Sequence, residues 1–276
     1  MSDPFAALGA DLAFLDLEHI DGDIYRGHPG VWPTDRDTIY GGEVAAQALR
    51  AAAYTVAADR EPHSLHGYFL RRGDPTQPVV FNVDRDRDGR SFSARRVAAM
   101  QRGEVIWDMA CSFHVAEHGA EFSQPLRTGI APPDDSPPID PDWCPLIDIR
   151  TPPPPDGGAV VPQSVDRVWA RVRVPVPDDP IVHACLHAYT SDISSGFGDL
   201  EMPGVPHGGP SIDHAVWFHH PSRADEWIIY DCVAAKVGGH RGLYTGTAHD
   251  MEGNLVAMIA QEMLLRPPSM SGQSGR

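Results

Sequence analysis

The segment YTSDISSG places a carboxylate where a helix would disfavour it. Asp192 follows Tyr189 by three residues and Cys185 by seven, so a helix through this segment carries Asp192 on its apolar face, at its C-terminal end. Burial and the negative end of the helix macrodipole both oppose an ionised carboxylate there. Burial also raises a carboxyl pKa, which suits a residue that accepts a proton. The sequence equally allows Asp192 to cap the Ser-Ser-Gly turn that follows it.

Three other motifs match functional patterns only in part. DRDRDG (84–89) begins like an EF-hand loop, but Arg95 stands where the bidentate glutamate belongs, so we predict a hairpin turn. HVAEH (114–118) has the spacing of a zinc peptidase class, yet the surrounding pattern predicts the end of a strand and not the helix that such ligands need. GFGDLE (196–201) lacks the third glycine of a dinucleotide site. We therefore predict neither a metal site nor a nicotinamide site.

The composition excludes several classes of protein. A net charge of −16 argues against general binding to nucleic acids or to anionic membranes, because both require basic residues against phosphates. The four cysteines are far apart and form no C-x-x-C, so we predict reduced, structural thiols. The N-terminal segment carries acids where a signal peptide carries bases, and no run of about 18 apolar residues occurs. We expect a cytoplasmic protein that does not bind membranes.

Proline placement divides the chain. Twelve of the 27 prolines fall between Pro125 and Pro162, in a stretch that suits neither a central strand nor a helix interior. We therefore predict an N-terminal unit at 1–122, a proline-rich linker at 123–163 and a C-terminal unit at 164–276.

The two units repeat one order of elements. HGYFLRR at 66–72 is similar to HAVWFHH, a shift of 148 residues, and RGEVIWDMAC at 102–111 is similar to EGNLVAMIAQ, a shift of 150 residues. Alternating apolar patterns and turns predict, in each unit, one helix followed by antiparallel strands, which is an α+β architecture. The predicted helices are 41–56 and 180–192. The predicted strands are 63–70 and three from the segment 82–113 in the first unit, and 168–174, 212–220, 226–237, 240–250 and 254–266 in the second.

The same segments carry a family resemblance. GGEVAAQAL, HSLHGYFLRRGD, DGRSFSARRVAAMQRGEVIW, SDISSGF, SIDHAVWFHHP and EGNLVAMIAQE follow one another in the order found in acyl-CoA thioesterase II. The resemblance covers residues 20–120 and 165–266. It implies a double hotdog fold, in which each of two tandem units wraps an antiparallel sheet around a central helix. It also implies a homo-oligomer, a homodimer or larger.

The resemblance further implies hydrolysis of fatty acyl-CoA by a water held by an aspartate, a hydroxyl and a glutamine, without a metal or redox cofactor. The matching positions are Asp192, Ser211 and Gln261. Taken singly, Ser211 suits a turn cap and Gln261 an ordinary strand residue. The first unit has Cys111 where the second has Gln261, so we expect the first unit to serve as scaffold and acyl-tunnel wall.

Arginines are the expected ligands of the CoA phosphates, because the planar guanidinium pairs well with phosphate oxygens. The candidates in the first unit are Arg71, Arg72, Arg90, Arg95 and Arg96. A solvated strand or turn face is the alternative role for each of them.

Two other functions remain open from the sequence. One is a catalytically silent protein that binds acyl-CoA as a scaffold. The other is a hotdog hydratase or dehydratase, which requires a histidine near the acid. No histidine follows Asp192 at the D-x-x-x-H type of spacing, and we interpret strand histidines such as His66 and His214 as hydrogen-bonded or surface residues.

Overall fold

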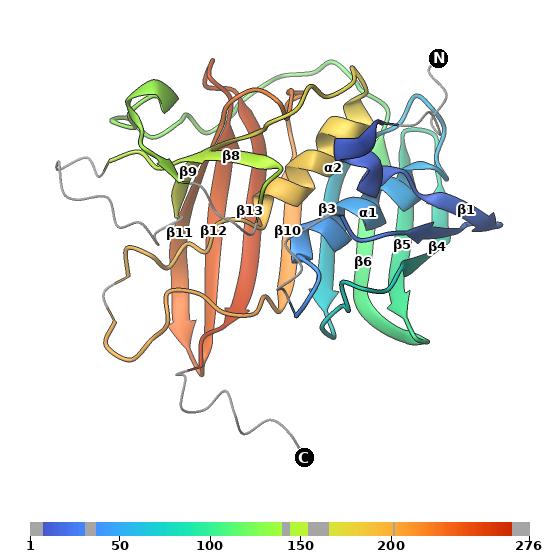
Figure 1. The fold of residues 1–276 in the computed structure, drawn as a ribbon. Helices are drawn as coiled ribbons and strands as arrows, with labels where there is room; N and C mark the ends of the chain where they lie inside the picture. The colour runs from blue at the N-terminus through green and yellow to red at the C-terminus, as the bar shows by residue number, and fades with distance from the viewer. Residues whose placement is uncertain (1–7, 31–36, 140–143, 154–165, 201, 267–276) are drawn as a thin grey trace.

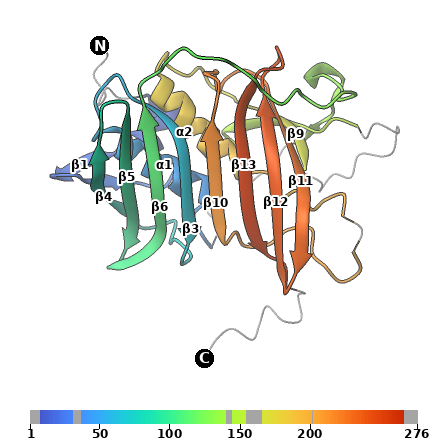
Figure 2. The same ribbon diagram turned by 180° about the vertical axis from the view of Figure 1, so that it is seen from behind.

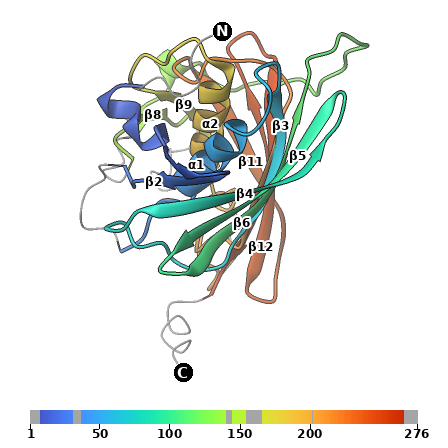
Figure 3. The same ribbon diagram turned by 90° about the vertical axis from the view of Figure 1, so that its right-hand side faces the viewer.

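A computed structural model describes residues 8–30, 37–139, 144–153, 166–200 and 202–266. Within them, 13 strands form one antiparallel sheet that curves around two helices, α1 (Gly41–Ala53) and α2 (Pro180–Ser191) (Figure 1). Figure 3 shows both helices on the concave side of the sheet. This α+β arrangement is the double hotdog that the resemblance implies.

The first unit begins with a short 3-10 helix and continues with strands on both sides of α1 in sequence. Its elements are η1 (Ala10–Leu15), β1 (Glu18–Asp21), β2 (Ile24–Gly27), β3 (Glu61–Phe69), β4 (Val79–Asp88), β5 (Phe92–Gln101) and β6 (Glu104–His114). Of the segment 84–89, predicted as a hairpin turn, the structure places residues 84–88 in β4, and the turn to β5 lies at 89–91. Helix α1 is rich in alanine, a strong helix former with a small side chain, and it ends three residues before the predicted end.

The second unit repeats this order around α2. Its elements are η2 (Pro133–Asp135), β7 (Pro138–Ile139), β8 (Ile147–Arg150), β9 (Arg167–Val172), β10 (Asp213–Phe218), β11 (Ile228–Gly238), β12 (Arg241–His249) and β13 (Leu255–Leu264). Helix α2 begins as predicted, because Asp179 accepts a hydrogen bond from Ile181 N (2.9 Å) and Pro180 occupies the first turn.

The sheet order mirrors the two units about their junction. It runs β1-β2-β4-β5-β6-β3-β10-β13-β12-β11-β9-β8-β7, so β3 and β10 pair at the centre (Figure 2). β7 and β8 fall within 123–163 and extend the second half of the sheet. The sequence pattern missed these two short strands, and part of the predicted linker lies outside the described residues.

Strand register tests the two predicted repeats. Leu65 pairs with Cys111, and by the continuation of the Ala215–Ala260 pair, His214 stands opposite Gln261. Cys111 and Gln261 are thus equivalent, which confirms the shift of 150. The shift of 148 is wrong by one residue, since it aligns His66, with a side chain 49 % exposed, with the fully buried His214. In a strand, a slip of one residue exchanges the faces of the sheet.

The helices run antiparallel, so the C-terminus of α2 packs on the N-terminus of α1. A Cβ on Gly42 would lie 2.3 Å from Tyr189 O, so only glycine permits this approach. Tyr40 Oη donates a hydrogen bond to the same carbonyl (2.9 Å). None of the described helices is long and apolar enough to span a bilayer.

Candidate active site

Asp192, Ser211 and Gln261 meet at one place in the fold. Asp192 ends α2, Ser211 precedes β10 in an isolated bridge to Met263, and Gln261 lies on β13. Gln261 Nε2 donates a hydrogen bond to Ser211 Oγ (2.7 Å). The Gln261 and Ser211 side chains also lie close enough to Asp192 to lower the pKa of its carboxyl group. Pairing between β10 and β13 explains the meeting of Ser211 with Gln261, and the end of α2 adds the acid.

The N-terminus of α1 completes this cluster. Its N-cap, Tyr40, provides no side-chain cap, so the first N–H groups of the helix are open to another partner. The backbone N–H of Gly42 lowers the pKa of the Asp192 carboxyl group. A Cβ on Gly41 would lie 2.7 Å from Asp192 Oδ2, so the glycine pair admits the carboxylate. The positive end of α1 thereby offsets the negative end of α2, a compensation that the sequence pattern around Asp192 could not reveal.

Asp192 is held in an environment that raises its pKa. Asp192 as a residue is partly exposed, but its Oδ1 atom is fully buried. Burial raises the pKa above the ordinary value of 3.8, while His214, Gln261, the Gly42 N–H and Ser211 act in the opposite direction. The outcome is a carboxylate that accepts a proton more readily than an exposed one.

His214 lies beside this cluster, which corrects our expectation that no histidine is near the acid. The imidazole is fully buried on β10, and its Nε2 lies 2.7 Å from Ser191 Oγ. The charge of Asp192 acts on the pKa of His214, yet burial dominates and lowers that pKa. Sequence spacing missed the contact because His214 approaches from another strand, 22 residues after Asp192.

Three hydrogen bonds hold the loop that follows Asp192. Tyr244 Oη donates to Ser194 O (2.7 Å), and the Asp166 carboxylate accepts from the backbone N–H groups of Gly198 (2.7 Å) and Asp199 (2.8 Å). These bonds come from β12 and from the residue before β9. The acid is therefore anchored from both ends, by α2 and by this loop.

The arginine candidates lie in different places. Arg95 is a correction: its guanidinium is buried and bonded to Thr55 Oγ1 (2.7 Å), Thr55 O (3.0 Å) and Asp88 (2.6 Å), so it cannot reach a phosphate. Arg96 faces the outer surface of the sheet, paired with two aspartates. Its phosphate role stays a prediction.

Arg71 and Arg90 lie at opposite ends of β3. The carbonyl of Arg90 accepts from Arg60, just before β3, whereas Arg71 follows the far end, where the Phe69 ring packs on Gly41. A nine-residue strand is about 27 Å long, so only Arg71 is near Asp192. Arg72 is exposed beside it.

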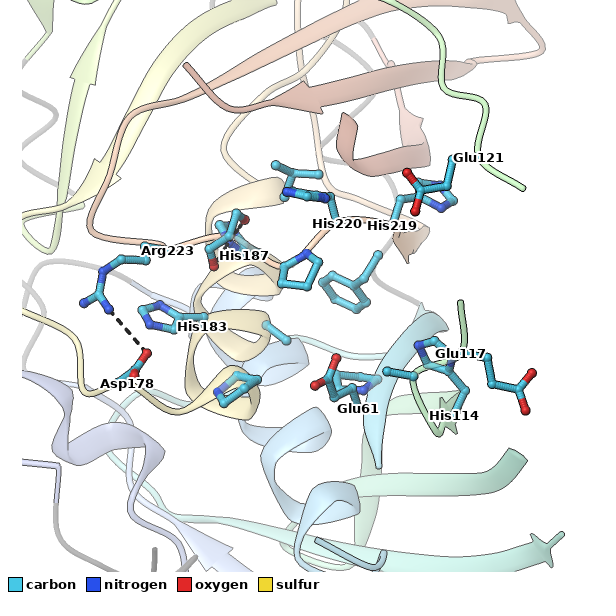
Figure 4. A pocket seen from close by; sticks show the side chains of 18 of the residues that line it. Glu61, His114, Glu117, Glu121, Asp178, His183, His187, His219, His220 and Arg223 are labelled. Carbon is cyan, nitrogen blue, oxygen red and sulfur yellow. Dashed lines mark hydrogen bonds and ion pairs between the residues drawn. The ribbon is translucent and has the colours of Figure 1, made fainter. Parts of the chain in front are cut away.

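A pocket of about 570 Å³ opens at the other end of α2 (Figure 4). His183 and His187 project into it from the helix, and Glu61 does so from the start of β3. The α2 residue of its lining that is nearest to Asp192 in sequence is His187, five residues before Asp192 and about 7.5 Å along the helix axis. Among the described residues, no three His, Cys, Asp or Glu side chains are arranged to hold a metal ion.

Known proteins resemble the chain along most of its length. A sequence model of an acyl-CoA thioesterase N-terminal domain matches residues 28–114, and one of an acyl-CoA thioesterase C-terminal domain matches residues 123–265. Acyl-coenzyme A thioesterase 8 of Mus musculus is 34 % identical, covering 91 % of this chain and 87 % of that protein. Acyl-CoA thioesterase 2 of Haemophilus influenzae is 31 % identical, covering 91 % and 95 %. The crystal structure of the acyl-CoA thioesterase II TesB2 from Mycobacterium marinum gives a TM-score of 0.78 at 42 % identity, over 93 % and 98 %.

Proposed function

The chain belongs to the acyl-CoA thioesterase II family and is an acyl-CoA thioester hydrolase; we propose that it hydrolyses fatty acyl-CoA by direct attack of a water held by Asp192, Ser211 and Gln261. The observation that carries this proposal is the meeting of these three side chains at the N-terminus of α1. Asp192 Oδ1 and Gln261 Oε1 are buried acceptors without a hydrogen-bond partner among the described residues, so both suit the protons of a bound water.

In the proposed reaction, Asp192 takes a proton from the water as its oxygen attacks the thioester carbonyl carbon. The C–O bond forms and the carbonyl becomes an oxyanion. The C–S bond then breaks as the oxyanion returns to a carbonyl, the departing CoA sulfur takes the proton held by Asp192, and the acid product loses its remaining proton to solvent to become the carboxylate. The raised pKa of Asp192 supports the role of base. The positive N-terminus of α1 and the hydroxyl of Ser211 stabilise the developing negative charge. A thioester carbonyl is electrophilic enough that no covalent enzyme intermediate is required.

The remaining parts of the proposal concern the surroundings of this site. We propose Arg71 as the arginine that meets a CoA phosphate, because it lies at the end of β3 nearest Asp192. Our proposal for the domains keeps an N-terminal scaffold unit at 1–122, a proline-rich segment at 123–163 and a catalytic unit at 164–276. A cytoplasmic location and a homo-oligomeric state also remain proposals.

Hydration of an enoyl-CoA is the second candidate function, because His214 lies next to Asp192. The two reactions are easily separated. A hydratase consumes the enoyl thioester without releasing a thiol, whereas a thioesterase releases free CoA. A silent binding protein does neither.

The decisive experiment measures thiol release from acyl-CoAs of short to long chain by the wild type and by Asp192→Asn. We expect the variant to bind acyl-CoA and to hydrolyse it at least about 100-fold more slowly, the scale of general-base loss. Asp108→Asn, on the exposed outer face of β6, is the matched control and should leave the rate unchanged. No release from any chain length, or an unchanged rate in Asp192→Asn, would overturn the proposed mechanism.

A further inference from the structure

His214 is a buried imidazole beside the proposed catalytic residues, and the mechanism above does not use it. Ala215 pairs with Ala260, so His214 and Gln261 are inward-facing neighbours on two hydrogen-bonded strands. The Nε2 atom of His214 lies 2.7 Å from the Oγ of Ser191, the last residue of α2. The imidazole thus connects the end of α2 to the strand β13.

Hydrogen bonds around Ser191 fix which imidazole nitrogen carries the proton. Ser191 Oγ donates to Ala188 O (2.9 Å), the usual back-bond of a helical serine. Because its single proton is used, Ser191 Oγ accepts from His214, and the imidazole proton lies on Nε2. Nδ1 is then a lone-pair acceptor, buried and without a hydrogen-bond partner in the described part of the chain. Burial lowers the pKa of His214, which keeps the ring neutral.

We propose that His214 is a positioning residue for Gln261: the lone pair on Nδ1 draws the amide NH2 end of Gln261 toward β10 and leaves Oε1 to accept a proton of the attacking water. Gln261 Nε2 already donates to Ser211 Oγ, and Oε1 is free of partners within the described residues. The reversed amide would set Oε1 against the Nδ1 lone pair, an unfavourable contact between two buried acceptors. Gln261 acts on the pKa of His214, so the amide and the imidazole are neighbours in the folded chain. The inference rests on the proposed function, since it concerns the same water.

The first unit supplies a comparison for this role. By strand register, Leu65 and Cys111 stand where His214 and Gln261 stand in the second unit. The imidazole and the amide are therefore both absent from the unit for which no reaction is proposed. Leu65 also shows which apolar side chain this position of the fold holds, so His214→Leu is the natural test substitution.

The test is a double-mutant cycle on acyl-CoA hydrolysis with His214→Leu, Gln261→Ala and the double variant. We expect His214→Leu to lower kcat by up to about 100-fold with KM unchanged, since misplacing one group in a site can have that effect. In the Gln261→Ala background, His214→Leu should have no further effect. His214→Asn, which keeps an acceptor near the position of Nδ1, should recover part of the rate.

Several results would overturn the inference. If the two single effects multiply, or if His214→Asn is no faster than His214→Leu, His214 does not act through Gln261. Thermal melting reports whether each variant folds; Ser191→Ala, which removes the bond that fixes the imidazole proton, should lower kcat only when Gln261 is present. If Gln261→Ala alone leaves hydrolysis unchanged, the proposed water site itself fails, which is a different outcome from multiplying effects.

Discussion

At both ends of the antiparallel helix pair an aspartate lies at a helix N-terminus, but the two aspartates interact with it differently. At one end, Asp192 from the C-terminus of α2 meets the uncapped N-terminus of α1. At the other end, Asp179 caps the N-terminus of α2 itself, and Arg50 of α1 lies 3.7 Å from that carboxylate. The cap uses the Ile181 N–H and Pro180 has no N–H, so this helix N-terminus offers fewer N–H groups to a second anion. The contrast suggests that the proposed catalytic end differs from the structural end first by the absence of a local cap.

A similar difference between the two units is found in strands β5 and β12. Arg95 and Tyr244 occupy equivalent positions, since they pair with the equivalent residues Cys111 and Gln261. Each one holds the segment after its helix: Arg95 bonds Thr55, and Tyr244 bonds the loop after Asp192. In the first unit the guanidinium itself fills the space beside Cys111. In the second unit the smaller reach of tyrosine leaves the buried amide of Gln261 facing the acid.

The largest effect should come from closing the helix end that receives Asp192. Gly41→Ala adds a Cβ that would lie 2.7 Å from Asp192 Oδ2 and 2.8 Å from the Phe69 ring, so the carboxylate must shift. We expect kcat for acyl-CoA hydrolysis to fall by about 100-fold, the effect of moving a catalytic group by about 1 Å. Gly119→Ala is the control, since its Cβ would meet nothing within 4 Å. Full activity in Gly41→Ala would show that the position of the carboxylate at this helix end is not critical.

Sequence patterns predicted the elements well because local alternation, Gly-containing turns and helix caps are local properties. They placed both helices and the long strands, and block order supplied Asp192, Ser211 and Gln261. They could not supply partners that arrive from distant strands or from the other helix. The close approach of Asp192 to Gly41 joins the two units, and the buried guanidinium of Arg95 bonds Thr55, 40 residues earlier. Contacts between segments so far apart in the sequence become visible only when the strands and helices are placed in three dimensions.

An intermediate effect should come from the equivalent position in the first unit. Arg95→Met removes two donors to Thr55 and keeps most of the side-chain volume. We expect the free energy of unfolding to fall by about 1–3 kcal/mol, the range for leaving buried polar groups unsatisfied, with kcat/KM unchanged. Urea unfolding and thiol release measure the two quantities. Arg96→Met, on the exposed face of the same strand, should change the free energy of unfolding by less than about 1 kcal/mol. A loss of activity in Arg95→Met without a loss of stability would give the first unit a direct part in catalysis.

The smallest expected effect is a gain in thermal stability when the carboxyl group of Asp192 is removed. The folded pKa of Asp192 is raised, chiefly by burial, so between 3.8 and that higher pKa the folded chain binds more protons than the unfolded chain. The free energy of unfolding contributed by Asp192 therefore falls as pH rises through this window, and at neutral pH the ionised carboxylate destabilises the fold. Asp192→Asn should melt at a higher temperature than the wild type at neutral pH, and the difference should shrink as the pH falls toward 3.8. The ionised carboxylate of Asp23 stabilises the fold at neutral pH, because its bonds to Arg85 (2.7 and 2.8 Å) lower its pKa. Asp23→Asn should therefore melt lower at neutral pH and approach the wild type in acid, so equal shifts in both variants would contradict a special environment for Asp192.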